Sequence, residues 1–179
     1  MHGAEPSVLY LTEFLRQFVR AESNFLFGYT LEWARPGHVV LAACTVEERE
    51  ALLEGVLLAT GLAGAASAAG TARAEAIKAA VPAETLAAWG ERLAALKGRA
   101  VADLLATLWE AVDATARRVG LLMAGDLLSA LRGWGRVTGA FDNPQGADVN
   151  DLDDVVKQRP ELADLLAFAA SPAFGRLLA

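Results

Sequence analysis

Three side chains in this sequence, His2, His38 and Cys44, are the residue types that bind zinc or act as nucleophiles and proton carriers. A hydrolase of the H-E-x-x-H type needs two histidines and a glutamate on one helical face, and neither histidine has such neighbours. A structural zinc site needs four ligands, so a pair formed by His38 and Cys44 lacks two of them. We therefore predict no metal site and no catalytic residue, with His38 in a loop and Cys44 as a buried thiol.

A run of acidic residues near the C-terminus partly matches the calcium-binding loop of EF-hands. Counted from Asp148, Asn150 fits the third position, but Leu152 stands at the fifth and Asp153 replaces the glycine of the sixth. Arg159 replaces the bidentate glutamate of the twelfth. The motif fails, and the run predicts a short helix whose N-terminal carboxylates favour the helix dipole. It comprises Asp148, Asn150, Asp151, Asp153 and Asp154.

Nucleotide binding and serine chemistry have no supporting motif either. Gly120 and Gly125 are not followed by the Lys-Ser/Thr pair that grips a nucleotide phosphate and its magnesium ion. No serine stands in a G-x-S-x-G setting. We predict no cofactor.

The overall composition excludes nucleic acid as a partner and favours a cytoplasmic location. The net charge is −6 over 179 residues, so the basic face that neutralises phosphates is missing. A single cysteine rules out an internal disulfide bond. The first residues lack the basic and apolar regions of a signal peptide. Hydrophobic residues make up 54% of the chain, and such an excess is typical of a surface that a partner covers.

Residues 55–72 carry no charge and are long enough to be considered as a membrane span. Their second half consists of Gly, Ala, Ser and Thr, which transfer weakly into hydrocarbon, so a membrane partner is not expected. The Ala/Gly-rich segment at 61–70 could be a flexible linker or a place where helix backbones approach closely on small residues. We favour a loop that leads into a helix from Thr71.

The spacing of apolar residues predicts an all-α fold, a single-domain irregular bundle of about six to eight helices over residues 1–179. The first helix should cover 6–27 and stop at Gly28, and an interrupted segment with a strand or helix turn should follow. Thr45 and Glu48 form a capping box. The central core helix should span 100–119, and Gly133 and Gly135 should end the apolar pattern that follows it. A loop is predicted at 139–148.

Aromatic residues supply the candidates for an interface. Tryptophans are more often core contents than binding anchors, but Trp134 between two glycines is the one expected to be exposed. The interface candidates are Trp33, Trp134, Phe141 and Phe174.

Residues 113–127 resemble a stretch of large bacterial tetratricopeptide-repeat proteins, whose C-terminal region resembles a gluzincin metallopeptidase of the CAAX-endopeptidase and heat-shock-protease type. In those peptidases the helix after H-E-x-x-H carries E-x-x-A-D-R, and its Glu is the third zinc ligand. Asp113 takes the place of that Glu, Ala116 of the Ala, Arg117 of the Asp and Arg118 of the Arg. The H-E-x-x-H motif is absent and Arg117 reverses the family's charge. The resemblance therefore implies a non-catalytic relic.

Two functions from different classes follow. The first is a non-catalytic protein-interaction or scaffold module that associates with itself or joins a larger bacterial assembly. The alternative is a helical domain that binds a small molecule or lipid in a cavity lined by tryptophan and leucine. An enzyme comes third, because it would need Asp113, Glu110 and His38 to converge.

Overall fold

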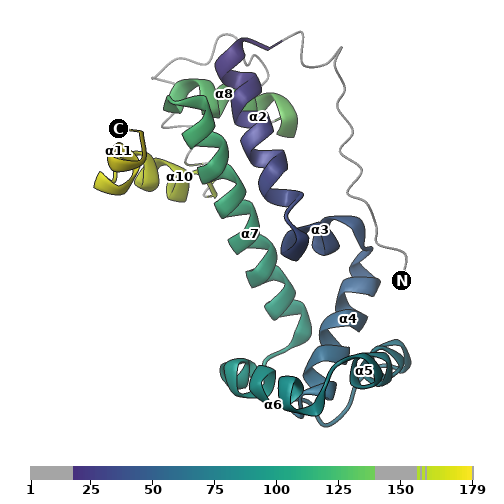
Figure 1. Cartoon of the computed structure of the whole chain (residues 1–179). Helices are drawn as coiled ribbons and strands as arrows, with labels where there is room; N and C mark the ends of the chain where they lie inside the picture. Colours follow the sequence, from purple (N-terminus) through teal and green to yellow (C-terminus); the bar gives the residue numbers. More distant parts are fainter. Residues whose placement is uncertain (1–17, 140–156, 158, 160, 179) are drawn as a thin grey trace. The chain divides into compact units, whose positions relative to one another are not determined.

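The computed structural model describes residues 18–139, 157, 159 and 161–178. These residues are all-α, as the apolar spacing predicts, with nine α-helices and one 3-10 turn and no strand (Figure 1). One reason for the higher count is that the segment predicted as interrupted holds a helix, α3. The helices are α2 (Arg20–Trp33), α3 (Pro36–Ala43), α4 (Val46–Ala59), α5 (Ala68–Ala80), α6 (Ala83–Arg92), α7 (Val101–Ala124), α8 (Leu127–Thr138), α10 (Glu161–Ala169) and α11 (Pro172–Leu178), and the 3-10 turn is Ala94–Leu96.

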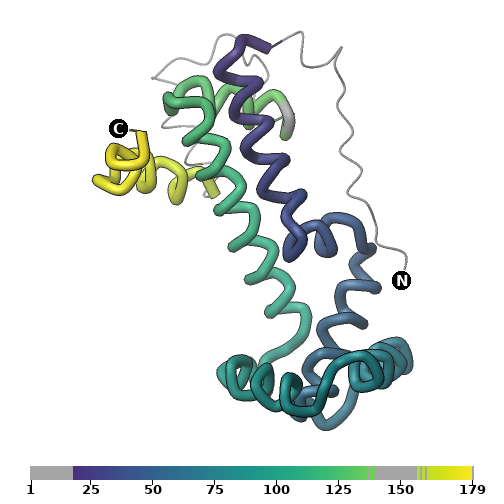
Figure 2. The backbone as a smooth tube through the Cα atoms, viewed as in Figure 1, coloured from purple at the N-terminus to yellow at the C-terminus, as the bar shows by residue number. Residues whose placement is uncertain are grey.

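The chain divides into two compact units. The first unit is Met1–Val39 with Ala111–Ala179, and the second unit is Val40–Glu110. The chain passes from one to the other within α3 and within α7, and Figure 2 shows the backbone of α7 as one uninterrupted helix. The expectation of a single domain stays a prediction.

In the first unit, the Phe25 ring of α2 packs between two glycines on different helices. A Cβ atom at Gly120 of α7 would lie 2.7 Å from the ring, and one at Gly133 of α8 would lie 3.1 Å from it. Gly28 does not stop α2, which continues to Trp33. A Cβ at Gly28 would lie 2.8 Å from the Val119 carbonyl oxygen of α7, so a glycine at this position lets the two helices pack closely. These glycines serve the close approach of helices, and the prediction of a helix end at Gly28 is wrong.

Trp134 is buried, with 5% of its surface exposed, so the expectation of an exposed side chain is wrong. The helix that holds it does not end at Gly133 or Gly135 but continues to Thr138, and Gly139 closes it with a φ of 64°. Helix α2 lies against Gly133, where a Cβ would be 3.1 Å from the Glu22 carbonyl oxygen, and the Trp134 indole joins the core. That core consists of Phe25, Leu26, Leu121, Ala130, Leu131, Trp134, Leu162 and Leu165.

In the second unit, α4 begins at the predicted capping box. The Thr45 hydroxyl accepts a hydrogen bond from the Glu48 amide at 3.3 Å, and the Thr45 amide donates to the Glu48 carboxylate at 2.8 Å. Helix α5 begins at Ala68, earlier than predicted, because Ser67 caps it and is held by Glu54 of α4. The last residues of the Ala/Gly-rich segment are therefore helical.

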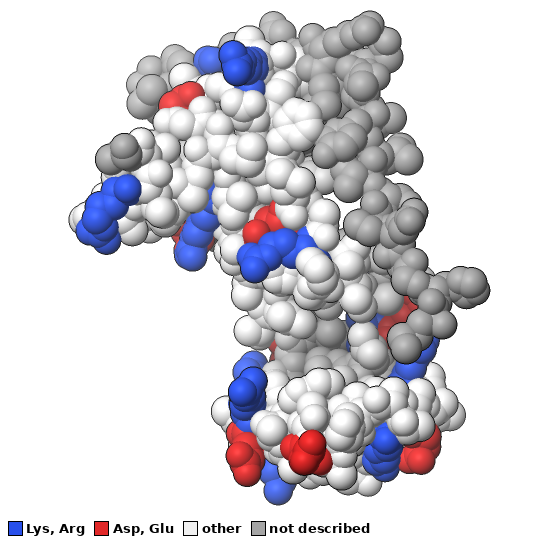
Figure 3. All heavy atoms as spheres, viewed as in Figure 1, with Lys and Arg blue, Asp and Glu red and all other residues white. Residues whose placement is uncertain are grey.

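Helices α4 and α5 approach closely over small residues. A Cβ at Gly55 would lie 2.7 Å from the Arg73 Cβ, and one at Gly70 would lie 2.7 Å from the Glu54 Cβ. Residues 55–72 thus comprise the end of α4, the connection at 60–67 and the start of α5. No helix of the described residues is long and apolar enough to span a membrane. Figure 3 shows one face, on which charged side chains form small separate groups with uncharged surface between them.

Candidate functional site

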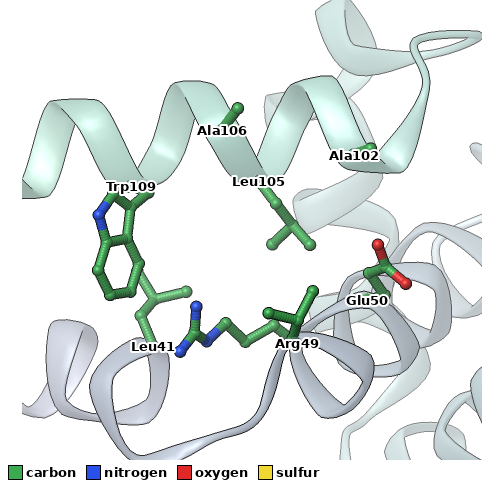
Figure 4. A pocket seen from close by; sticks show the side chains of 8 residues that line it. Leu41, Arg49, Glu50, Ala102, Leu105, Ala106 and Trp109 are labelled. Atoms are coloured by element: carbon green, nitrogen blue, oxygen red, sulfur yellow. The ribbon is translucent and has the colours of Figure 1, made fainter.

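The second unit contains an apolar groove between α7 on one side and α3 and α4 on the other. Its volume is about 280 Å³. Leu105 points into the space between the helices, Trp109 closes one end, and Glu50 lies at the other (Figure 4). The groove is open to solvent, since Val46 is 56% exposed and Trp109 is 39% exposed. It is lined by Leu41, Val46, Arg49, Glu50, Ala102, Leu105, Ala106 and Trp109.

The wall that α7 contributes follows from helical periodicity. Ala102, Leu105, Ala106 and Trp109 stand three, four and seven positions apart, so they share one face of the helix. The two alanines leave the middle of this face shallow, while Leu105 and Trp109 supply apolar area. We refer to these four residues as the α7 groove face.

Arg49 is fixed in position at the Trp109 end of the groove. Its Nε donates a hydrogen bond to the Cys44 carbonyl oxygen at 3.0 Å, and its guanidinium carbon lies 4.6 Å from the centroid of the Trp109 ring. A cation over an indole face stabilises the pair by roughly 0.5–1 kcal/mol at an exposed site. Tryptophan and arginine are the residue types that carry most binding energy at protein interfaces. This pair is therefore a pre-positioned anchor.

Asp113, which the resemblance places at a zinc-ligand position, has both carboxylate oxygens engaged within the first unit. The Tyr29 hydroxyl donates to Oδ1 at 2.5 Å, and Arg117 forms an ion pair with Oδ2. Arg117 is buried, with 5% of its surface exposed. The Asp113 carboxylate thus compensates the charge of a buried cation, Arg117.

Burial, followed by the hydrogen bond to Asp113, raises the pKa of Tyr29 above the ordinary value of about 10. The folded state therefore favours the neutral phenol. Stability from this preference is fully present below the ordinary pKa and is lost as the pH rises beyond it. In a Tyr10→Phe variant, where Tyr29 is the remaining tyrosine, near-ultraviolet tyrosinate absorbance should appear only above that pH or together with alkaline unfolding. Ionisation at the ordinary pKa with unchanged circular dichroism would contradict this environment.

Three of the four predicted interface residues are described, and Phe174 packs against the core cluster to which Trp134 belongs. Trp33 is half-buried at the end of α2. Phe174 is half-buried on α11, where its ring meets that of Phe168 edge to face at 5.7 Å. Trp134 belongs to the core, and Phe141 lies outside the described residues.

Of the residues considered for metal binding, His38 and Cys44 are among the described residues and His2 is not. His38 stands in α3, not in a loop, and its Nδ1 lies 3.3 Å from the buried carboxylate of Glu32. Cys44 is only half-buried, just beyond α3. No group of three or more potential metal ligands occurs among the described residues, and the acidic run at 148–154 lies outside them.

Arg49 and Trp109 were not among the predicted interface residues. The available signal was the spacing of Ala102, Ala106 and Trp109, which gives the central helix a second face with small residues beside an aromatic one. Leu104, Leu105 and Leu108 on the same helix also have the spacing of core residues. The sequence therefore does not distinguish the groove face of α7 from its core face.

Comparison with known proteins identifies no family for this chain. The resemblance of residues 113–127 to a gluzincin region accordingly stays a prediction, and the groove is the feature from which function is argued. The sequence matches no protein-family model, no curated protein and no solved structure.

Proposed function

We propose that this chain is a non-catalytic helical interaction module and that the groove of the second unit is where a protein partner docks. The observation that carries the proposal is Trp109, an exposed indole held beneath Arg49 on the wall of an apolar groove. Tryptophan and arginine are the residue types most enriched among binding hot spots, and this pair stands on an apolar groove that is open to solvent.

The openness of the groove favours side chains of a partner over an enclosed small molecule. Pockets for small ligands enclose about 300–1,000 Å³ and bury most of the ligand surface. This groove has about 280 Å³, and Val46 and Trp109 at its edges remain exposed. A cavity lined by tryptophan and leucine thus has less support than a docking groove.

The engagement of Asp113 supports the non-catalytic part of the proposal. A carboxylate that already accepts from Tyr29 and pairs with Arg117 is poorly placed to bind a metal or move a proton. Its removal from this network would leave Arg117 as an uncompensated buried cation.

The test uses peptides selected for binding to the full chain from a displayed library of helix-forming sequences. Trp109→Ala should weaken the selected peptides by about thirtyfold, since truncating an interface tryptophan often costs 2 kcal/mol or more. Ala106→Gln should also weaken them, because it places a polar side chain in the groove at an exposed helical position. Circular dichroism checks that both variants keep their helices.

Ala88→Gln is the matched control, since Ala88 is exposed on α6 and does not line the groove. It should leave the affinity unchanged. Peptides that bind all four proteins equally would place docking elsewhere, and a selection that yields no binder would overturn the proposal.

A further inference from the structure

The rim of the groove is acidic, and this bears on which partner fits. Helix α4 and the part of α7 within the second unit carry six carboxylates against one guanidinium, that of Arg49. Three of the carboxylates are used locally, since Glu47 and Glu48 accept hydrogen bonds at the start of α4 and Glu54 holds Ser67. The other three are Glu50, Asp103 and Glu110.

Those three carboxylates have no hydrogen bond or ion pair to any described residue. Glu50 lines one end of the groove. Asp103 and Glu110 are exposed and stand seven positions apart on α7, in the row beside the α7 groove face. Arg49 offsets one of these charges, and its guanidinium is held at the Trp109 end of the groove by the Cys44 carbonyl and the Trp109 ring. An excess of negative charge thus remains along the edges of an apolar surface.

We propose that the groove takes a basic amphipathic helix from another protein, an inference that rests on the proposed function. The α7 groove face extends over about two turns, roughly 10 Å at the helical rise per residue. A docked helix would place apolar residues at matching spacing into the groove and lysine or arginine beside Glu50, Asp103 and Glu110. A second copy of this chain would bring its own acidic rim and be repelled.

The experiment compares three fluorescently labelled peptides of about 15 residues, the length at which isolated helices begin to form. All three have leucine at the same helical positions, and the remaining positions are lysine, glutamine or glutamate. Fluorescence anisotropy with the full chain at low salt should give the tightest binding for the lysine peptide and the weakest for the glutamate peptide. The preference should shrink as salt is added, since the rim is exposed to solvent.

Removing two rim charges provides the structural test. The double variant Glu50→Gln with Glu110→Gln should weaken the lysine peptide by about fivefold, as expected for two exposed charge pairs. Binding of the glutamine peptide should not change. The control is Glu91→Gln, which removes an exposed carboxylate of α6 outside the groove and should have no effect on either peptide.

The outcomes separate the two proposals. If the lysine and glutamate peptides bind equally and Ala106→Gln weakens both, the groove docks helices without selecting charge, so the basic partner is wrong and the proposed function stands. If Ala106→Gln weakens neither, the proposed function itself is wrong. A dimer in light scattering that Ala106→Gln dissociates would replace the basic helix with a second copy.

Discussion

Replacing Phe25 by alanine should lower the free energy of unfolding of the first unit by about 3–5 kcal/mol, the usual cost of removing a buried phenyl group. Phe25 is 1% exposed and fills the space between Gly120 and Gly133. The backbones of the two glycines bound part of this site, since a Cβ would lie 2.7 Å from the ring at Gly120 and 3.1 Å from it at Gly133. A site bounded by backbone collapses poorly, so the cavity should persist and the cost should be near the upper end.

Urea unfolding followed by circular dichroism measures this loss. The matched control is Leu31→Ala on the same helix, where the side chain is 48% exposed and the change should stay within about 0.5 kcal/mol. Equal effects of the two substitutions would show that Phe25 is not the packing centre of α2 against α7 and α8.

The features that the sequence predicts well depend on residues close together in the chain. The capping box of Thr45 and Glu48 needs only two side chains three positions apart and the backbone between them, so its motif is sufficient. The all-α fold is predicted for the same reason, because apolar spacing of three and four is a local property. The start of α5 was misplaced because Glu54, thirteen positions away, holds its capping serine.

The glycines show why the rest could not be predicted. Gly28 and Gly133 have the composition of helix ends, yet both stand inside helices because another helix passes against them. No residue near Gly28 or Gly133 in the chain distinguishes a glycine that ends a helix from a glycine that contacts another helix. The burial of Trp134 follows from that contact, and so does the failure to identify it as a core residue.

The groove was missed for a related reason. Trp109 and the leucines of α7 have similar local patterns, and which of them a neighbour covers depends on where α3 and α4 pack. The Arg49 contact joins residues sixty positions apart, so no spacing rule reports it. The hydrophobic composition predicts an uncovered apolar surface, but it does not indicate which residues form that surface.

Asp113→Ala should be about as destabilising as the loss of Phe25, for an electrostatic reason. The substitution leaves Arg117, 5% exposed, without its carboxylate, and an uncompensated buried charge costs about 3–5 kcal/mol. The Tyr29 hydroxyl also loses its acceptor. Urea unfolding measures the change, and Glu110→Ala, at an exposed position of the same helix, should stay within about 0.5 kcal/mol.

A double variant separates the value of the ion pair from the cost of breaking it. Replacing both charges, Asp113→Leu with Arg117→Met, removes the desolvation cost of each group together with their attraction, and such replacements are often neutral or stabilising. We therefore expect the double variant to unfold at a higher urea concentration than Asp113→Ala alone. A double variant as unstable as the single one would mean that the carboxylate stabilises the fold through Tyr29, because the phenol loses its acceptor in both variants. Tyr29→Phe in the double background would then restore stability.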